Sequence, residues 1–328
     1  MGKSVKIVTI DVGGTNARFA IAEIGDGHVR HMGEPTTFAT GGVSGLAAAW
    51  KRFEKTQPEA LPRAASIAVA GPVNEDEIRF TNSHWVIKPA ELADELGVDS
   101  HVLINDFEAV GHAVARAKPE YFVHLAGPDE ALPDHGVTSI AGPGTGLGVA
   151  QLIHTGNGGY RVQPTEGGHI GFAPEDRVEE QLLDHVRGVF PRVSVERMCS
   201  GPAIVQIAEA IAHIENLPMP SGDDRELWLS ALTGSDQVAV KACERFCMIL
   251  GAAAGDFALA HGANGVVIAG GLGLRLKETL TKPGFAERFV YKGRFKGLMQ
   301  KIPVKLITHP QPGLFGAAAA YAQTHAPG

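Results

Sequence analysis

The chain has 328 residues, of which 44% are hydrophobic and 20% are charged, which is typical of a globular protein. This length suggests two domains, because single domains commonly contain ~100–200 residues. The 29 Lys and Arg against 36 Asp and Glu give a formal net charge of −7, which argues against nucleic acid or an anionic membrane as the main partner.

The cysteine content and the apolar segments bear on the expected compartment. Three cysteines in a chain of this length do not make a disulfide framework, so a reducing cytoplasm is expected. The most apolar stretch, residues 247–260, is shorter than the ~20 residues of a membrane span and contains Asp256. The first apolar run stops at Asp11, too early for a signal-peptide core. These features predict a cytoplasmic protein without a membrane span.

A glycine-rich turn lies between the first two predicted strands. Residues 5–10 are β-branched and apolar and predict a buried strand, and residues 19–24 predict a second strand. Because the turn joins two strands, it differs from the Rossmann loop and the P-loop, in which a strand leads through glycines into a helix. The turn reads Asp11-Val12-Gly13-Gly14-Thr15-Asn16-Ala17-Arg18.

The same pattern recurs in the second half of the chain. Residues 137–141 and 147–153 predict strands, and Gly142-Pro143-Gly144-Thr145-Gly146 connects them. Two such strand–turn–strand segments suggest a duplicated architecture. An ordinary tight hairpin is the alternative for each turn taken alone.

Helical patterns and further strands fill the rest of the chain. Helices are predicted over residues 45–55, 89–96, 106–117, 179–186, 201–214, 235–261 and 313–321. Strands are predicted over residues 101–104, 266–269 and 302–307. Strands that alternate with helices predict an α/β fold with much parallel sheet. A domain boundary is expected near Lys118-Pro119-Glu120, because Pro119 follows the end of a predicted helix.

The two glycine-rich turns have the chemistry of phosphate sites. Each turn presents several backbone N–H groups and a threonine hydroxyl, and the missing Cβ atoms let a phosphate oxygen approach. Asp11 stands beside the first turn, where a carboxylate would repel phosphate unless a cation lay between them. The sequence therefore suggests Mg²⁺ at Asp11, held through water.

Polar residues gather at three further places. Asn105 and Asp106 follow a predicted strand, although Asp106 could instead be only a helix N-cap. Glu166 and His169 flank two glycines, and a carboxylate and an imidazole beside such backbone suit sugar hydroxyls. Glu196 stands near a predicted helix start and could be only a first-turn residue.

Several other motifs are excluded by their spacing. Gly2-Lys3-Ser4 lacks the upstream glycine of a Walker A loop, and residues 142–148 do not match G-x-G-x-x-G. Neither H-E-x-x-H nor G-x-S-x-G occurs. Cys243 and Cys247 have no second pair for a metal site, so a buried helix face is expected. The basic run at residues 292–296 is interpreted as a solvated loop.

Seven motifs occur in an order that resembles the bacterial glucokinase family, part of the hexokinase–actin superfamily of ATPases. The resemblance extends from about Ile7 to about Tyr321. It implies an actin-like (ribonuclease H-like) α/β fold of two domains with a ligand cleft between them. The small domain would comprise residues 1–117 plus 309–328, and the large domain residues 118–308. The motifs are residues 11–18, 81–85, 104–107, 144–149, 166–169, 196–202 and 268–271.

The resemblance implies a reaction and roles for particular residues. The family phosphorylates the 6-hydroxyl of D-glucose with ATP and Mg²⁺, and the glucose 6-phosphate enters glycolysis. Asp106 resembles the catalytic base, and Asn105 resembles its glucose-binding neighbour. The other implied glucose ligands are Asn82, which could be only a turn residue, and Glu166, His169 and Glu196.

The resemblance also implies nucleotide contacts, partners and an absence of zinc. Pro143 removes one donor from the second turn. The related ROK sugar kinases carry a cysteine-rich zinc motif after the Glu-x-Gly-His-type segment, but residues 170–174 contain no cysteine, so structural zinc is not expected. A homodimer is implied. The implied ATP contacts are Ile10, Asp11, Val12, Gly13, Gly14, Thr15, Asn16, Gly142, Gly144, Thr145 and Gly146 at the phosphates, with Gly270 and Gly271 in the turn next to adenosine.

Two alternative functions fit the same residues. The first is a kinase for another hexose or an amino sugar, because hydroxyl-binding residues suit pyranoses in general. The second is a sugar sensor that binds but does not catalyse. A chaperone-type ATPase would need a peptide-binding domain, for which the chain is too short.

Overall fold

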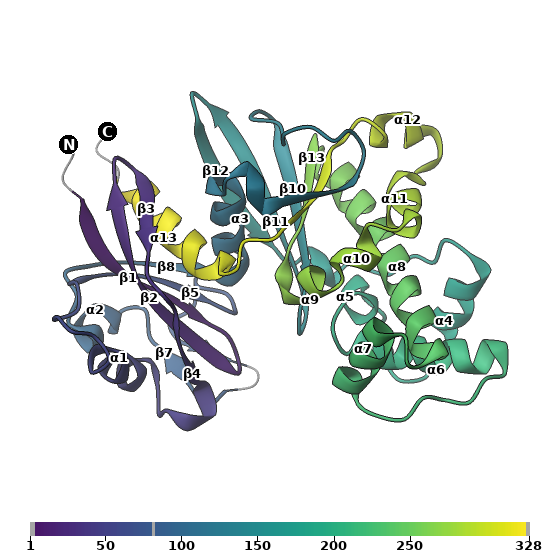
Figure 1. The fold of residues 1–328 in the computed structure, drawn as a ribbon, viewed down its shortest axis with the longest axis horizontal. Helices are drawn as coiled ribbons and strands as arrows, with labels where there is room; N and C mark the ends of the chain where they lie inside the picture. The colour runs from purple at the N-terminus through teal and green to yellow at the C-terminus, as the bar shows by residue number, and fades with distance from the viewer. Residues whose placement is uncertain (1–3, 81–82, 326–328) are drawn as a thin grey trace. The chain divides into compact units, whose positions relative to one another are not determined.

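The chain folds into two units in the computed structural model, which describes residues 4–80 and 83–325. Unit 1 combines the residues up to Ala117 with those from His309 onward, and unit 2 runs from Lys118 to Thr308. Each unit contains a large mixed β-sheet with helices packed on it (Figure 1). The predicted α/β class is therefore confirmed.

The large sheet of unit 1 begins with an antiparallel hairpin and continues with parallel strands. β1 pairs antiparallel with β2 and parallel with β5, and β5 pairs parallel with β8. The strand order is β3-β2-β1-β5-β8, and β4 pairs with β2. All six residues of β5 are buried, because a central parallel strand is covered on both faces. The strands are β1 (Val5–Val12), β2 (Asn16–Gly25), β3 (His28–Met32), β4 (Thr36–Ala39), β5 (Ala64–Val69) and β8 (Ser100–Asn105).

Helices cover both faces of this sheet, and the two-residue period of β1 sends alternate side chains to each face. Val8 and Ile10 pack in one apolar cluster with residues of α1 and α2, whereas Ile7 packs with Tyr321 of α13. The C-terminal helix therefore belongs to the core of unit 1. The other elements are α1 (Leu46–Glu54), α2 (Leu92–Leu96), α3 (Asp106–Arg116), α13 (Pro312–Thr324), the 3-10 helix η1 (Thr40–Gly42) and the small hairpin of β6 (Ile78–Arg79) and β7 (Val86–Ile87).

Helices α3 and α13 cross at close range because small residues lie at the crossing. A Cβ atom on Gly316 of α13 would collide with the carbonyl oxygen of Ala109 in α3. On the sheet side, Thr9 Oγ1 donates a hydrogen bond to the carbonyl of Leu314, at 2.7 Å. These contacts fix α3, and α3 carries Asp106 as its first residue.

Five strands of the large sheet of unit 2 repeat the five-strand order of unit 1, and its sixth strand is β9, whereas the sixth strand of unit 1 is β4. β10 pairs antiparallel with β11 and parallel with β13, and β13 pairs parallel with β14. The order β12-β11-β10-β13-β14-β9 matches β3-β2-β1-β5-β8 strand for strand, apart from β9. The duplicated architecture suggested by the sequence is thus confirmed. The strands are β9 (Phe122–Ala126), β10 (Val137–Pro143), β11 (Leu147–Gly156), β12 (Gly159–Thr165), β13 (Gly265–Ile268) and β14 (Val304–Ile307).

The helices of unit 2 pack around the long helix α8. The Asp236 side chain caps the start of α8 by accepting from Ala239 N, and the helix ends at the left-handed Gly262. Gly251 and Gly255 let α11 approach α8, because a Cβ atom on either would meet the backbone of α11. The helices are α4 (Arg177–Arg187), α5 (Val195–Met198), α6 (Ala203–Glu215), α7 (Asp224–Thr233), α8 (Gln237–His261), α9 (Gly270–Arg275), α10 (Lys277–Leu280), α11 (Pro283–Val290), α12 (Lys296–Met299) and the 3-10 helices η2 (Pro119–Tyr121), η3 (Gly167–His169) and η4 (Gly293–Phe295).

A buried ion-pair network ties α4, α8 and α11 together. Glu179 of α4 is 1% exposed and Arg288 of α11 is 7% exposed, and their charged groups lie 2.7 Å apart. Arg245 of α8 also bonds Glu179, at 3.0 Å. Removing either partner would leave an unpaired buried charge, so this network positions the helices rather than offering a site.

The structure corrects some element boundaries expected from the sequence. Gly270 and Gly271 are the first residues of α9 rather than a turn, because the chain enters a helix directly after β13. In residues 89–96 only Leu92–Leu96 is α-helical. The strand expected from residue 302 starts at Val304. Cys243 and Cys247 are buried on α8, as predicted.

Candidate active site

The first glycine–threonine hairpin uses only part of its backbone for its own structure. Gly13 N–H donates to the carbonyl of Asn16 at 2.9 Å and so closes the turn between β1 and β2. The N–H groups of Gly14 and Thr15 donate to no group in the described part of the chain. Thr40, which belongs to no sequence motif, fixes the turn from outside, because its Oγ1 donates to the Gly14 carbonyl at 2.8 Å. Two adjacent donors therefore remain for an anion.

The three residues before this hairpin point their side chains alternately into the apolar core and away from it. The side chains of Ile10 and Val12 are buried in the apolar core, so only their backbone could reach a nucleotide. Asp11 lies between them and points to the opposite face. Its Oδ2 pairs with Arg18 Nη1 at 3.2 Å, and its side chain is 20% exposed. Burial raises the pKa of Asp11, and the neighbouring Arg18 partly opposes this rise.

The donors around Asp11 fit a magnesium ion that is shared with a nucleotide. In the described residues no group of three or more His, Cys, Asp or Glu side chains is arranged to hold a metal. Mg²⁺ does not need such a group, because it is commonly bound by one or two carboxylates, substrate phosphates and water. The Asp11 carboxylate, on the strand that leads into this hairpin, would be such a ligand.

Asn105 and Asp106 stand where β8 ends and α3 begins. The helix N-cap is Asn105, whose Oδ1 accepts from Phe107 N at 2.8 Å and from Glu108 N at 3.2 Å. The alternative that Asp106 is only the cap is therefore wrong. Asn105 Nδ2 donates to the carbonyl of Gly71 at 3.1 Å, so the capping side chain is held from two sides.

Asp106 is left with a carboxylate oxygen free for chemistry. Its Oδ1 accepts from Phe107 N at 2.9 Å, and Oδ2 has no hydrogen bond within the described residues. Burial raises the pKa of Asp106 to about 6, with a further contribution from the negative charge of Asp11. A half-buried carboxyl with a pKa near neutrality is suited to general base catalysis.

The second hairpin, in unit 2, has the same design. Gly142 and Pro143 belong to β10, where they pair with Gly148 and Leu147. Gly144 N–H is used to close the turn on the carbonyl of Gly146, at 2.8 Å. The N–H groups of Thr145 and Gly146 donate to no group among the described residues. The two free donors thus match the pair in the first hairpin.

Gly270 lies against the base of this second hairpin. Its φ of +82° is in the left-handed region, and a Cβ atom there would stand 2.6 Å from the carbonyl oxygen of Pro143. Both the backbone conformation and the close approach therefore require glycine at this position. Gly271 follows and is exposed.

Glu166, His169 and Glu196 come together in unit 2. His169 Nε2 lies 3.7 Å from Glu166 Oε2, and His169 Nδ1 lies 3.9 Å from Glu196 Oε1. Glu166 precedes η3 and His169 is its last residue, and Glu196 is in the first turn of α5, which Ser194 caps. The side chains of Glu166 and His169 are 83% and 58% exposed, so their polar groups are open to a ligand.

Asn82 lies outside the described residues. Its neighbour Trp85 is buried, and Trp85 Nε1 donates to the carbonyls of Thr40 and Val43. The expected residues therefore fall into two sets, with Asp11 and Asp106 in unit 1 and the acid–imidazole cluster in unit 2.

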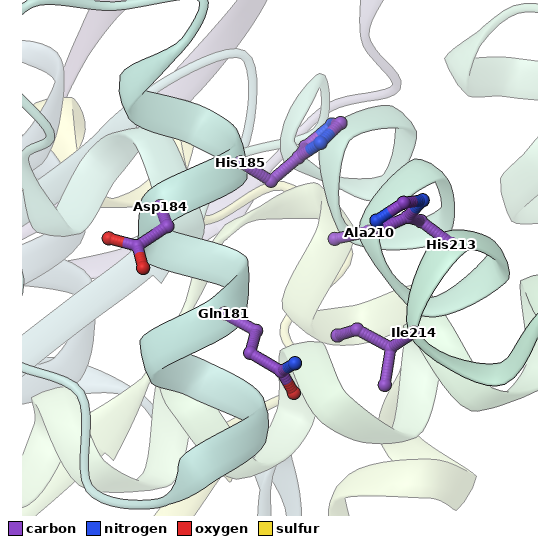
Figure 2. A pocket seen from close by; sticks show the side chains of 6 residues that line it. All are labelled: Gln181, Asp184, His185, Ala210, His213 and Ile214. Atoms are coloured by element: carbon purple, nitrogen blue, oxygen red, sulfur yellow. The ribbon is translucent and has the colours of Figure 1, made fainter.

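A pocket elsewhere in unit 2 is separate from these residues. It has a volume of about 270 Å³ and lies between α4 and α6 (Figure 2). Its lining contains none of the expected ligand or catalytic residues. The lining residues are Gln181, Asp184, His185, Ala210, His213 and Ile214.

No helix in the described ranges combines the length and the apolar character that crossing a membrane requires.

The fold places the chain in the class of actin-like sugar kinases. A crystal structure of a glucokinase from an Antarctic psychrotroph matches with a TM-score of 0.84 and 32% identity, over 96% of this chain and 98% of that chain. A ROK family glucokinase from Streptomyces griseus, solved with glucose and AMPPNP, matches with a TM-score of 0.62 and 18% identity, over 96% and 98%. The second match, at this low identity, supports the fold alone.

Sequence comparison identifies the family within that class. The family model described as Glucokinase matches residues 8–324. A glucokinase of Zymomonas mobilis is 56% identical over 321 residues, which cover 98% of this chain and 99% of that protein. The chain belongs to the glucokinase family of enzymes.

Proposed function

We propose that this enzyme transfers the γ-phosphoryl group of ATP to the 6-hydroxyl of D-glucose. The observation that carries the proposal is Asp106, a half-buried carboxyl with one free oxygen and a pKa raised to about 6. The similarity to the glucokinase of Zymomonas mobilis supports the sugar, and the free N–H donors of the two glycine–threonine hairpins support a nucleotide phosphate as donor.

Asp106 acts as the base in this reaction. As the glucose 6-oxygen forms a bond to the γ-phosphorus, the bond from that phosphorus to the bridging oxygen breaks and ADP leaves. The proton of the 6-hydroxyl passes to the free oxygen of Asp106. The backbone bond from Phe107 holds the other oxygen, so the carboxylate is oriented before the substrate arrives.

The polar cluster of unit 2 orients the sugar. Glu166, His169 and Glu196 offer carboxylate acceptors and an imidazole to the ring hydroxyls. Asn105 and Asn82 complete the proposed glucose ligands, Asn105 through the same side chain that caps α3. Oriented hydroxyls place the 6-oxygen for in-line attack, which lowers the barrier without covalent chemistry.

The hairpins hold the phosphates through their free N–H groups. The donors are Gly14 and Thr15 in the first hairpin and Thr145 and Gly146 in the second. Mg²⁺, when bound, offsets negative charge on the transferring phosphoryl group, and Asp11 would hold it through water. Gly270 and Gly271 would lie next to adenosine.

We propose that unit 1 and unit 2 are the two functional domains, that the enzyme is a cytoplasmic homodimer, and that its product enters glycolysis. Size-exclusion chromatography with light scattering tests the dimer directly.

The test of the function is a coupled assay of ADP release with ATP and Mg²⁺. Glucose, mannose, fructose, galactose and N-acetylglucosamine are compared, beside the variant Asp106→Asn. Turnover confined to glucose, with kcat lowered by ~10²–10⁴-fold in the variant while glucose still binds, is the expected result. Turnover on another sugar would move the specificity, binding without turnover would favour a sensor, and normal kcat in Asp106→Asn would remove it as the base.

A further inference from the structure

The sugar-binding cluster and the second hairpin meet at a single peptide group. Leu147 is the first residue after the hairpin, and its N–H donates to Glu196 Oε2 at 2.9 Å. Its carbonyl oxygen faces Gly168 of η3, where a Cβ atom would collide with it. Both segments that carry the proposed glucose ligands therefore contact the strand that leaves the hairpin.

The segment that follows Glu196 contacts the other side of the hairpin. Gly201 N–H donates to the carbonyl of Gly144 at 2.7 Å. The carbonyl of Gly201 accepts from Nε1 of Trp228, which is 2% exposed, at 2.8 Å. The hairpin is thus bonded at both of its ends by one stretch of chain, and that stretch is anchored in the apolar core.

The two carboxylate oxygens of Glu196 face different groups. Oε2 accepts from Leu147 N–H, whereas Oε1 faces Nδ1 of His169 at 3.9 Å. The side chain is 26% exposed, so a ligand can still reach it. The same acid is therefore a member of the polar cluster and a fixed support of the hairpin.

We infer that Glu196 is a positioning residue, which couples glucose binding to the placement of the phosphate-binding hairpin Gly144–Gly146. This inference rests on the proposed function, since it takes Glu196 as a glucose ligand and the hairpin as a phosphate site. A sugar hydroxyl that fixes the carboxylate also fixes Leu147 N–H and the neighbouring donors of Thr145 and Gly146. By linkage, an altered hairpin must in turn change the affinity for glucose.

Gly146 offers a way to disturb this contact without removing any sugar ligand. A Cβ atom on Gly146 would stand 2.5 Å from Glu196 Oε2 and 3.3 Å from its Cδ, and no other group would lie within 4 Å. The φ of Gly146 is outside the left-handed region, so its backbone accepts alanine. The atoms in the way belong to the end of a flexible side chain, so Gly146→Ala would move the Glu196 carboxylate and leave the fold in place.

The experiment measures glucose affinity by calorimetry in the absence of any nucleotide. Gly146→Ala is expected to raise the glucose Kd roughly tenfold, about the loss of one charged hydrogen bond. The control is Gly297→Ala in α12, outside the hairpin, because a Cβ atom there would meet nothing within 4 Å. An unchanged Kd in Gly146→Ala, or an equal rise in Gly297→Ala, would overturn the inference.

A stability cycle tests the contact itself. Thermal unfolding is compared for Gly146→Ala, Glu196→Ala and the double variant. If Gly146→Ala acts through Glu196, its effect on Tm disappears once the carboxylate is absent, so the two changes are not additive. Additive changes, or a failure of Gly146→Ala to fold even with Glu196→Ala, would contradict the inference.

The proposed function and the proposed role of Glu196 are refuted by different results. Wild-type protein that neither binds nor phosphorylates glucose would refute the proposed function, and the inference with it. Wild-type protein that binds and phosphorylates glucose, with a normal glucose Kd in Gly146→Ala, would refute the inference alone.

Discussion

Three residues connect β1 to β2 in unit 1, Gly13 to Thr15, and three connect β10 to β11 in unit 2, Gly144 to Gly146. Both connections contain only glycine and threonine, and in both the first glycine N–H closes the turn. Two adjacent N–H donors stay free in each connection, within the described residues. Short turns between twisted strands leave such donors without an internal partner, so the same backbone arrangement occurs in both units.

The two hairpins differ in where their carboxylate comes from. Asp11 is part of β1 and pairs with Arg18 across the hairpin, in the same stretch of sequence. Glu196 is brought to the second hairpin from α5, 49 residues after Leu147. Each carboxylate abuts a glycine, Gly313 for Asp11 and Gly146 for Glu196. We therefore expect Asp11 to act on the nucleotide and Glu196 to act on the sugar. Variants of the residues around each hairpin test this difference.

The largest difference between the hairpins is expected from Asp11→Asn. If Asp11 holds Mg²⁺ through water, kcat should fall by ~100-fold, the upper range for loss of an outer ligand. Glucose affinity should remain within about twofold of wild type, because the polar cluster of unit 2 is untouched. Kinetics at varied Mg²⁺ and calorimetry with glucose measure the two effects.

The control for this variant is Asp76→Asn, which changes an exposed carboxylate. It should leave both kcat and the glucose Kd unaltered. Normal kcat in Asp11→Asn would contradict the proposed role of Asp11 in holding Mg²⁺. It would also contradict the proposed functional difference between the two hairpins.

A smaller effect is expected from Gly313→Ala, the unit 1 counterpart of Gly146→Ala. A Cβ atom on Gly313 would stand 2.8 Å from Cγ and Oδ2 of Asp11 and would push the carboxylate aside. A displacement below 1 Å should lower kcat about tenfold. The glucose Kd should not change, in contrast to Gly146→Ala.

Two further variants test whether the effect of Gly313→Ala on kcat arises through Asp11. Gly297→Ala in α12 is the control, because nothing lies within 4 Å of its Cβ position. In an Asp11→Ala background, Gly313→Ala should have no additional effect on kcat. A further loss of kcat in the Asp11→Ala background would show that Gly313→Ala disturbs helix α13 rather than the Asp11 carboxylate.

The smallest expected effect is on the pH dependence of turnover. Burial and the charge of Asp11 raise the pKa of Asp106 to about 6. Because the base must be ionised, kcat should fall as the pH drops below about 6. In Asp11→Asn the neighbouring charge is gone, so the acid limb should move to lower pH. A pH–rate profile of both enzymes measures this, and an acid limb at the same pH in both would show that the two carboxyls do not interact.

The sequence predicted the repeated strand–turn–strand pattern well, because alternating apolar runs and glycines are local signals. It did not single out β5, the buried central strand of unit 1, since residues 64–69 carry neither a turn motif nor a polar site residue. It also mistook the start of α9 for a turn. Glycines at a helix start and in a turn look alike until the packing of Gly270 on Pro143 is known.

In the candidate site, too, the sequence predicted local motifs but not the contacts between residues that are distant in the chain. Sequence motifs named Asp106, but they did not distinguish it from Asn105 as the cap of α3, because either residue type caps a helix. Thr40 was missed, since a lone threonine gives no signal until it bonds the Gly14 carbonyl. The pKa of Asp106 was equally out of reach, because it depends on burial and on Asp11, far away in the chain.

The sequence by itself determined the family, the two glycine–threonine hairpins and the acidic residues beside them, because these are properties of short contiguous stretches. Only the tertiary structure decided that one carboxylate, Glu196, supports the second hairpin while facing His169. It also decided that the charge of Asp11 raises the pKa of Asp106. The physical reason is that hydrogen bonding, burial and Coulomb interaction depend on distance in space, which chain separation does not encode.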